Sequence, residues 1–347
     1  MAVEILGWQI ANWLFMMLAA FAGGAFGASI GALPSFVFAG LAVIAGEAAG
    51  LATGTSSTLT GQIGFGAFFG PHIAFAGGVA AAAYAAKNDM IESGFAYHNA
   101  KDITYALGTH PKVLSVGGVF GILGLIITRA ATHFSLPLDP IALGVVLSAV
   151  ATRLVFRYPL IGKSRGKGLL DMSPFEEDEH RGEDEDSRLS VEPWLPQEYK
   201  WSHVSILGFV AGVLGGFTAI STGSAFLAFG ISAASLLFLE LGVENFPVTH
   251  HMTLPGSTAA LAIFAGAPAV GSANAVIALA VAGLFGIFGA VVGELVERIF
   301  YSHSDTHFDP PAAAIVVTTF VIAMLAVAGV FEGSSWLAIP EMLQSGA

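Results

Sequence analysis

Apolar runs of about 20 residues alternate along the chain with short segments that hold most of its charged side chains. As a helix, a run of this length crosses the roughly 30 Å hydrocarbon core of a bilayer. The pattern predicts an all-α polytopic membrane protein with about ten transmembrane helices. The expected spans are Trp8–Ile30, Leu33–Ala52, Ile63–Ala86, Val113–Phe134, Pro140–Phe156, Val204–Thr222, Ser224–Leu241, Pro247–Ala265, Ala275–Phe300 and Pro311–Phe331.

Composition supports this class. Of 347 residues, 55% are hydrophobic and only 11% are charged, whereas a soluble domain has about 25% charged residues. The lipid bilayer is therefore an expected partner. The chain has no cysteine, which excludes thiolate metal sites and thiol nucleophiles. It also lacks P-loop, GxGxxG, GxSxG and HExxH patterns, so we expect neither an enzyme nor a cofactor.

Short patterns recur in the same order in the two halves, which indicates an internal duplication. Each half is expected to hold five spans, an odd number, so the second half enters the membrane from the opposite side. The sequence thus predicts two inverted five-helix repeats. The matched segments are Gly23–Gly31 with Gly215–Gly223, Phe68–His72 with Phe246–His250, Gly118–Gly124 with Gly283–Gly289, and Asp139–Pro140 with Asp309–Pro310.

An acidic segment separates the halves. We expect a first repeat over residues 1–157, a linker over 158–202 and a second repeat over 203–347. The linker region holds 11 of the 25 acidic residues, and such a run cannot bury apolar surface, so it is expected to be solvated and disordered. The net charge of −12 disfavours nucleic acid as a partner and would suit a halophilic source.

Lysine and arginine positions predict the orientation in the cell membrane. Most of them fall between Lys87 and Lys112 or in the linker, and such residues favour the cytoplasmic side. Both termini are then expected outside. In an alternative, the third span of each half is a re-entrant hairpin and the repeats are parallel; the charges do not distinguish the two.

Ionisable residues inside apolar spans are candidate functional residues, because burying them is costly. His72 and His250 lie in the two third spans, beside prolines that interrupt the helix. Broken helices of inverted repeats form the central site of many secondary transporters. We expect the two histidines to line one shared substrate site; the alternative is that they hydrogen-bond to neighbouring carbonyls and only hold helices together.

Glu47 is a further candidate, a carboxylate within a glycine- and alanine-rich span. It could carry an ion, or it could form hydrogen bonds with the loop that follows the span. Ser29 and Ser221, matched serines of the first repeated motif, complete the expected substrate-binding set. Asp139 and Asp309 precede prolines and are expected to cap helices. No catalytic residue and no metal site are predicted, since the cluster His303–Asp309 lies in a loop without a counterpart.

The segment Thr306–Val317, THFDPPAAAIVV, resembles the short signature of the HPP membrane proteins, some of which are associated with nitrite transport. The resemblance covers under a tenth of the chain, and no residue role is carried over. We expect a transporter or facilitative channel for a small polar solute or ion, with its site between the repeats. The alternative is a non-transport scaffold or assembly subunit whose glycine-rich faces pack against a partner or form a homo-oligomer.

Overall fold

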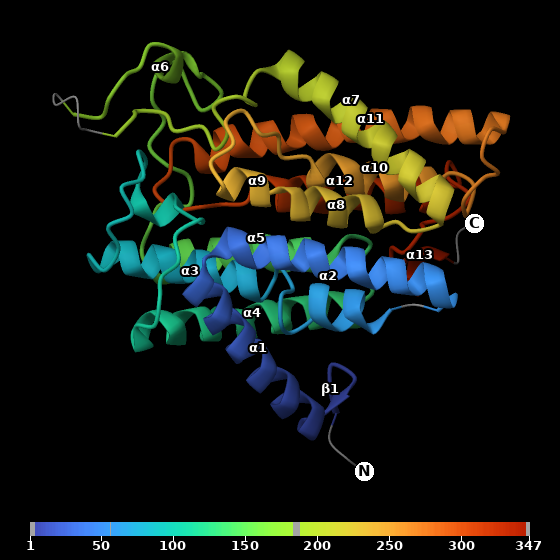
Figure 1. Ribbon diagram of the computed structural model, residues 1–347, viewed down its shortest axis with the longest axis horizontal. Coiled ribbons are helices and arrows are strands. Elements are labelled where there is room, and N and C mark those ends of the chain that lie inside the picture. The colour runs from blue at the N-terminus through green and yellow to red at the C-terminus, as the bar shows by residue number, and fades with distance from the viewer. Residues whose placement is uncertain (1–3, 56, 183–187, 345–347) are drawn as a thin grey trace.

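A computed structural model describes residues 4–55, 57–182 and 188–344. Its architecture is almost entirely helical (Figure 1). Within the described residues, six helical segments are long and apolar enough to cross a membrane. They are α1 Ile10–Ile30, α2 Ala32–Thr53, α4 Pro111–His133, α7 Trp201–Thr222, α11 Ala273–Val296 with its π-helical extension η3 Glu297–Tyr301, and α12 Pro310–Val327.

Shorter elements complete the fold. A small antiparallel hairpin precedes α1, and short helices lie between the long ones. These elements are β1 Glu4–Ile5, β2 Trp8–Gln9, η1 Leu59–Gly64 (π), α3 Ala74–Lys87, η2 Asn99–Lys101 (3-10), α5 Pro140–Val155, α6 Ser173–Glu176, α8 Leu227–Ser235, α9 Leu237–Glu240, α10 His250–Ala262 and α13 Glu341–Gln344.

The third segment of each half is shorter than the sequence predicts. The expected span Ile63–Ala86 begins in η1, continues through turns and becomes helical only at Ala74. Its counterpart is the 13-residue α10, of which every residue is buried. Both helices are enclosed by other helices, which is why glycine, proline and histidine are tolerated in or beside them.

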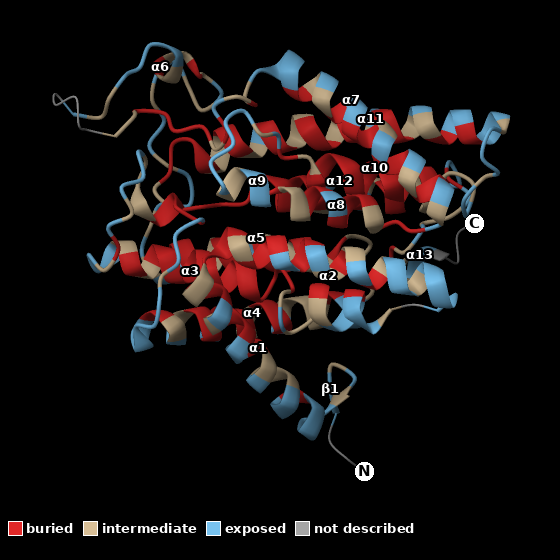
Figure 2. Ribbon diagram, viewed as in Figure 1, coloured by how far each residue is buried: buried red, intermediate tan, exposed pale blue. Residues whose placement is uncertain are grey.

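Many large apolar residues of the long helices are exposed, and Figure 2 shows exposed positions along these helices. Leu18 of α1, Ile206 of α7 and Val276 of α11 are each more than 60% exposed. Contiguous apolar surface of this kind is unfavourable in water, since soluble monomers rarely expose large apolar patches. The exposed belt and the helix lengths together identify an α-helical membrane protein.

Two groups of helices form the molecule (Figure 1). In the first group α1 packs against α3 and α4, and α5 packs against α4. In the second group α7 packs against α10 and α11, and α12 packs against α11. The groups meet where α2 contacts α8 and where α5 contacts α12. The largest buried apolar cluster lies at this meeting and draws residues from both groups.

Glycines allow the closest helix contacts. A Cβ added to Gly24 of α1 would collide with the backbone of Gly117 in α4, and one added to Gly212 of α7 would collide with that of Ala282 in α11. Small residues are what let membrane helices approach so closely. These glycine faces are therefore already packed against other helices of the same chain.

Part of the acidic segment between the groups is packed, which differs from the wholly solvated linker expected from its charge: residues 190–193 are buried, whereas residues 176–179 are exposed. Glu192 is fully buried and accepts a hydrogen bond from the fully buried Lys101 at 2.6 Å. Arg188 also binds Glu192 and Asp305. Opposite charges from distant loops neutralise one another here, so these groups can be buried. The most acidic stretch, residues 183–187, lies outside the described residues.

Candidate substrate cavity

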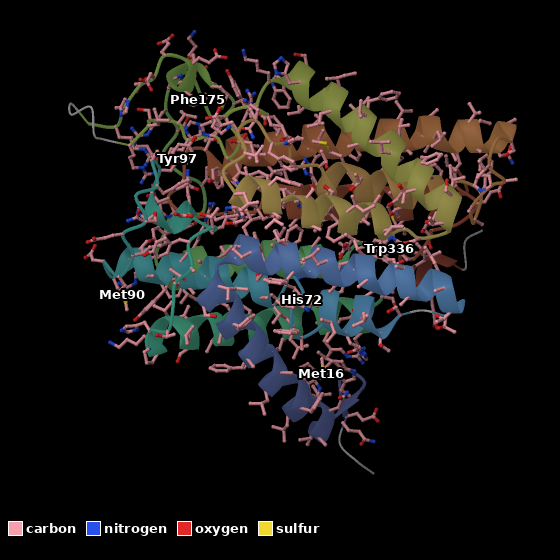
Figure 3. All side chains as sticks on the ribbon, in the orientation of Figure 1. Met16, His72, Met90, Tyr97, Phe175 and Trp336 are labelled. Atoms are coloured by element: carbon pink, nitrogen blue, oxygen red, sulfur yellow. The ribbon has the colours of Figure 1, made fainter. Side chains whose placement is uncertain are left out.

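A cavity of about 250 Å³ lies where the two groups of helices meet. Its walls come from the beginning of α2, from the segment around α3, and from α5, α8, α10 and α12. Seven of the lining residues are aromatic: Phe36, Phe65, Phe75, Trp194, Phe226, Phe229 and Trp336. Figure 3 places Trp336 between the two groups of helices. The cavity is therefore a shared, mainly apolar space, not a polar one.

Two aspartates bring carboxylates to this cavity. Asp139 caps α5, because its Oδ1 accepts hydrogen bonds from the backbone N–H of Ile141 at 2.8 Å and of Ala142 at 3.1 Å. Asp309 caps α12 through its Oδ2, which accepts from the N–H of Ala312 at 2.7 Å. The sequence correctly predicts capping at both positions. It does not reveal that both residues line the cavity, because that depends on the packing of α5 against α12.

His250 is the polar side chain most enclosed by the aromatic wall. It lines the cavity and is 5% exposed, and its ring lies 4.9 Å from that of Phe36 and 5.9 Å from that of Phe229. Its Nδ1 has no hydrogen-bond partner among the described residues. Nδ1 of His72 and Nδ1 of His251 also lack a partner, so His250 differs from them by its place in the cavity wall. His250 is the predicted site residue that the structure places at the cavity.

His72 lies elsewhere. It is buried in the first group of helices (Figure 3), where its carbonyl oxygen lies against Gly124 and its Cβ lies against Gly144. The neighbouring Pro71, not His72, contributes to the cavity wall. In the second group the carbonyl oxygen of His251 lies against Gly289 in the same way. The sequence pattern pairs His72 with His250, and this pairing stays a prediction.

Glu47 connects the two halves at the far end of α2. Its Oε1 accepts a hydrogen bond from the hydroxyl of Thr60 at 2.8 Å, and its Oε2 accepts one from the hydroxyl of Ser224 at 2.5 Å. Ser224 in turn accepts hydrogen bonds from backbone N–H groups at the start of α8. Glu47 thus has the loop partner that the sequence suggested as one possibility, and it does not line the cavity.

The two predicted serines are also away from the cavity. The hydroxyl of Ser29 donates to the carbonyl of Phe26 within α1 at 2.7 Å. Ser221 is exposed near the end of α7. Their shared motif reflects helix packing by the neighbouring glycines.

Lys101 and Glu198 are buried charged residues at one end of the bundle, outside the cavity. Burial lowers the pKa of Lys101 to about 8, although Glu192 beside it acts in the opposite direction. Burial likewise raises the pKa of Glu198 to about 8, while a hydrogen bond from the N–H of Val248 opposes this. Within the described residues no group of three or more His, Asp or Glu side chains is arranged to hold a metal ion. His307 instead contacts Asp309, with 3.3 Å between Nε2 and Oδ1.

Residues 6–340 match a family described as a family of unknown function, DUF7973. No curated protein and no solved structure matches the chain.

Proposed function

The chain belongs to the DUF7973 family, and we propose that it is a membrane transporter or facilitative channel for a small solute, with the cavity between the two helix groups as its solute site. The observation that carries this proposal is the cavity itself. It lies at the contact between the halves, and it holds an unpartnered, buried imidazole nitrogen of His250. Small-molecule sites are concave, mostly apolar and provided with a few polar groups.

We further propose that the halves are inverted repeats that cross the membrane about ten times, with α3 and α10 as short crossing helices. Matching contacts support this. A Cβ added to Gly118 would collide with the ring of Phe21, and one added to Gly283 would collide with the ring of Phe209. The carbonyls of His72 and His251 meet matching glycines. These contacts match Phe21 of α1 with Phe209 of α7. The sequence motif matches Gly23 with Gly215 instead, which shifts the alignment of the two helices by about one helical turn.

Helix directions at the contact between the halves agree with inversion. Gly40 of α2 lies beside Ala234, while Gly230 of α8 lies beside Val43, so the two helices are antiparallel. α5 and α12 are antiparallel as well, since the N–H of Asp139 donates to the hydroxyl of Thr319 at 3.0 Å and Ala149 packs near Phe308. Equivalent helices related by a two-fold axis in the membrane plane must run in opposite directions.

The cavity favours an organic solute over a bare metal ion. Hard cations need six or more oxygen ligands in proteins, and the walls are mostly aromatic and aliphatic. The scaffold alternative needs glycine faces that are free to bind a partner or a second copy. The glycines described above are instead buried against helices of the same chain, so transport is the better supported function.

The orientation in the membrane follows the same proposal. The loops around Lys101, Glu192 and Asp305 meet at one end of the bundle. The hairpin before α1 binds Arg129 near the end of α4, and Trp336 packs against Phe226 at the start of α8. We propose that the end with Lys101, Glu192 and Asp305 is cytoplasmic and that both termini lie outside.

Solute flux into proteoliposomes tests the function. Vesicles are placed in gradients of tetramethylammonium chloride, glycerol or sodium acetate, and reswelling is followed by stopped-flow light scattering. We expect faster reswelling than in empty vesicles for at least one solute. Ala142→Phe, which fills the cavity, should abolish the increase, whereas Ala280→Phe on the exposed face of α11 should preserve it. No increase for any solute, or an increase that Ala142→Phe leaves intact, would overturn the proposal.

A further inference from the structure

We propose that the cavity selects a compact organic cation, such as a substituted ammonium group on a short apolar body. This inference rests on the proposed function and adds the class of solute. It follows from three properties of the walls: their charge, their aromatic faces and the position of the two carboxylates.

Charge distinguishes the cavity from an ordinary apolar void. Its described lining contains two carboxylates, Asp139 and Asp309, and no lysine or arginine. Within the described part of the chain, the hydrogen bonds of the Asp139 carboxylate use only Oδ1. Oδ2 is therefore left for a ligand. A cation opposite a carboxylate in a water-poor space interacts more strongly than the same pair in water.

Aromatic rings supply the second property. Seven of the lining residues are phenylalanine or tryptophan, and the faces of such rings attract cations, most strongly when the cation is desolvated. Aromatic walls combined with carboxylates suit an alkylammonium group better than a neutral hydrocarbon or an anion. His250 adds a ring nitrogen that can accept a hydrogen bond from an ammonium N–H when the imidazole is neutral.

Size restricts the ligand. A volume of about 250 Å³ lies just below the usual range for small-molecule pockets, about 300–1,000 Å³. It therefore favours a small ligand, such as a quaternary ammonium ion or a protonated primary amine.

The two carboxylates lie at different depths. Asp139 donates its backbone N–H to Thr319 of α12, which is ten residues along the helix from Asp309. At 1.5 Å per residue, this places the two backbone positions about 15 Å apart. A compact cation can then contact one carboxylate at a time, and it can pass from one to the other through the aromatic section. Asp139 and Asp309 are also the matched residues of the proposed repeats, so each half supplies one such contact.

Ligand binding to the full chain in detergent tests this inference. Trp194 and Trp336 line the cavity, so quenching of their fluorescence reports on occupancy after Trp8, Trp13 and Trp201 have been replaced by phenylalanine. The probes are choline and its neutral carbon isostere, dimethylbutanol. We expect choline to bind on the order of tenfold more tightly, since a desolvated cation–π contact contributes that much or more.

Charge-removing variants make the test specific. Asp139→Asn and Asp309→Asn keep a side chain that can cap a helix, and each should weaken choline binding about tenfold without affecting dimethylbutanol. Asp171→Asn is the control, because Asp171 lies in the segment between the halves and outside the cavity. Equal affinity for the two probes, unchanged choline binding in both variants, or binding of neither probe would overturn the inference. The reswelling assay with Ala142→Phe would still decide the proposed function separately.

Discussion

His72 and His251 make the same backbone contact in two different helix groups. The carbonyl oxygen of His72 occupies the space that a side chain at Gly124 of α4 would need, and the carbonyl oxygen of His251 does the same at Gly289 of α11. Each histidine precedes, by five residues, a glycine that faces the neighbouring helix, Gly77 in α3 and Gly256 in α10. The short central helix of each half is thus held by the same device.

This relationship predicts that the two glycines are equally intolerant of substitution. Gly124→Ala and Gly289→Ala place a methyl group on a carbonyl oxygen, and overpacking of this kind costs about 1–3 kcal/mol or more. Both variants should lower the thermal unfolding temperature in detergent by similar amounts. Gly61→Ala is the control, because no atom lies within 4 Å of its added Cβ. A wild-type melting temperature for either α4 or α11 variant would show that the contact is loose.

Glu47 should stabilise the contact between the halves without carrying an ion. Glu47→Ala removes the acceptor for Thr60 and Ser224, and hydrogen bonds to a charged group contribute about 1.5–3 kcal/mol each, less at this half-buried position. We expect a lower melting temperature but continued solute flux in reconstituted vesicles. Glu244→Ala, at an exposed loop, serves as the matched control. Loss of flux at unchanged stability would instead make Glu47 part of the transport mechanism.

Lys101 should give the folded protein a characteristic pH dependence. Its pKa of about 8 in the folded state lies below the ordinary value of 10.5. Between these values the unfolded chain binds one proton more than the folded chain, so this residue makes the free energy of unfolding rise with pH. Lys101→Met should lose this rise, whereas Lys112→Met, at an exposed lysine, should keep it. Denaturant unfolding at intervals from pH 7.5 to 10 measures the slopes. Parallel slopes for wild type and Lys101→Met would contradict the lowered pKa.

The orientation can be read from two introduced thiols, because the chain has no cysteine of its own. Ser164→Cys lies in the segment between the halves and Ser335→Cys lies after α12, and both positions are exposed. A membrane-impermeant maleimide added to intact cells should label Ser335→Cys only. Labelling of Ser164→Cys under the same conditions, or labelling of both, would contradict the proposed topology.

The amino-acid pattern was sufficient for features that depend on local chemistry. Long apolar runs predict the six helices of spanning length, but they also predict four further spans where the described residues form shorter helices. Aspartate before proline predicts the caps at Asp139 and Asp309, because capping involves neighbouring residues only. The cavity was not predictable in this way. Phe36, Trp194 and Phe229 come together only through the packing of distant segments, and nothing in a phenylalanine or tryptophan marks it as a cavity wall instead of a core residue.

For the linker, the prediction from sequence was wrong in part. Its charge run predicts solvation, yet Glu192 is buried because Lys101, 91 residues earlier in the chain, supplies the opposite charge. Composition describes a segment in isolation and does not include such a distant partner. The choice of His250 over His72 depends on a similar detail: His250 faces the aromatic wall, and His72 faces the glycines of its own half.

Accessibility of the cavity from both sides of the membrane tests the central claim most directly. Ala312→Cys introduces a single thiol into the cavity wall, and a cationic, membrane-impermeant methanethiosulfonate reagent is added to right-side-out and to inverted vesicles. If the cavity opens alternately to each side, the thiol is modified in both preparations and choline slows the reaction, while Ala278→Cys, in the dry packing of α11, stays unmodified. Modification from one side only, or from neither, would contradict transport through this cavity.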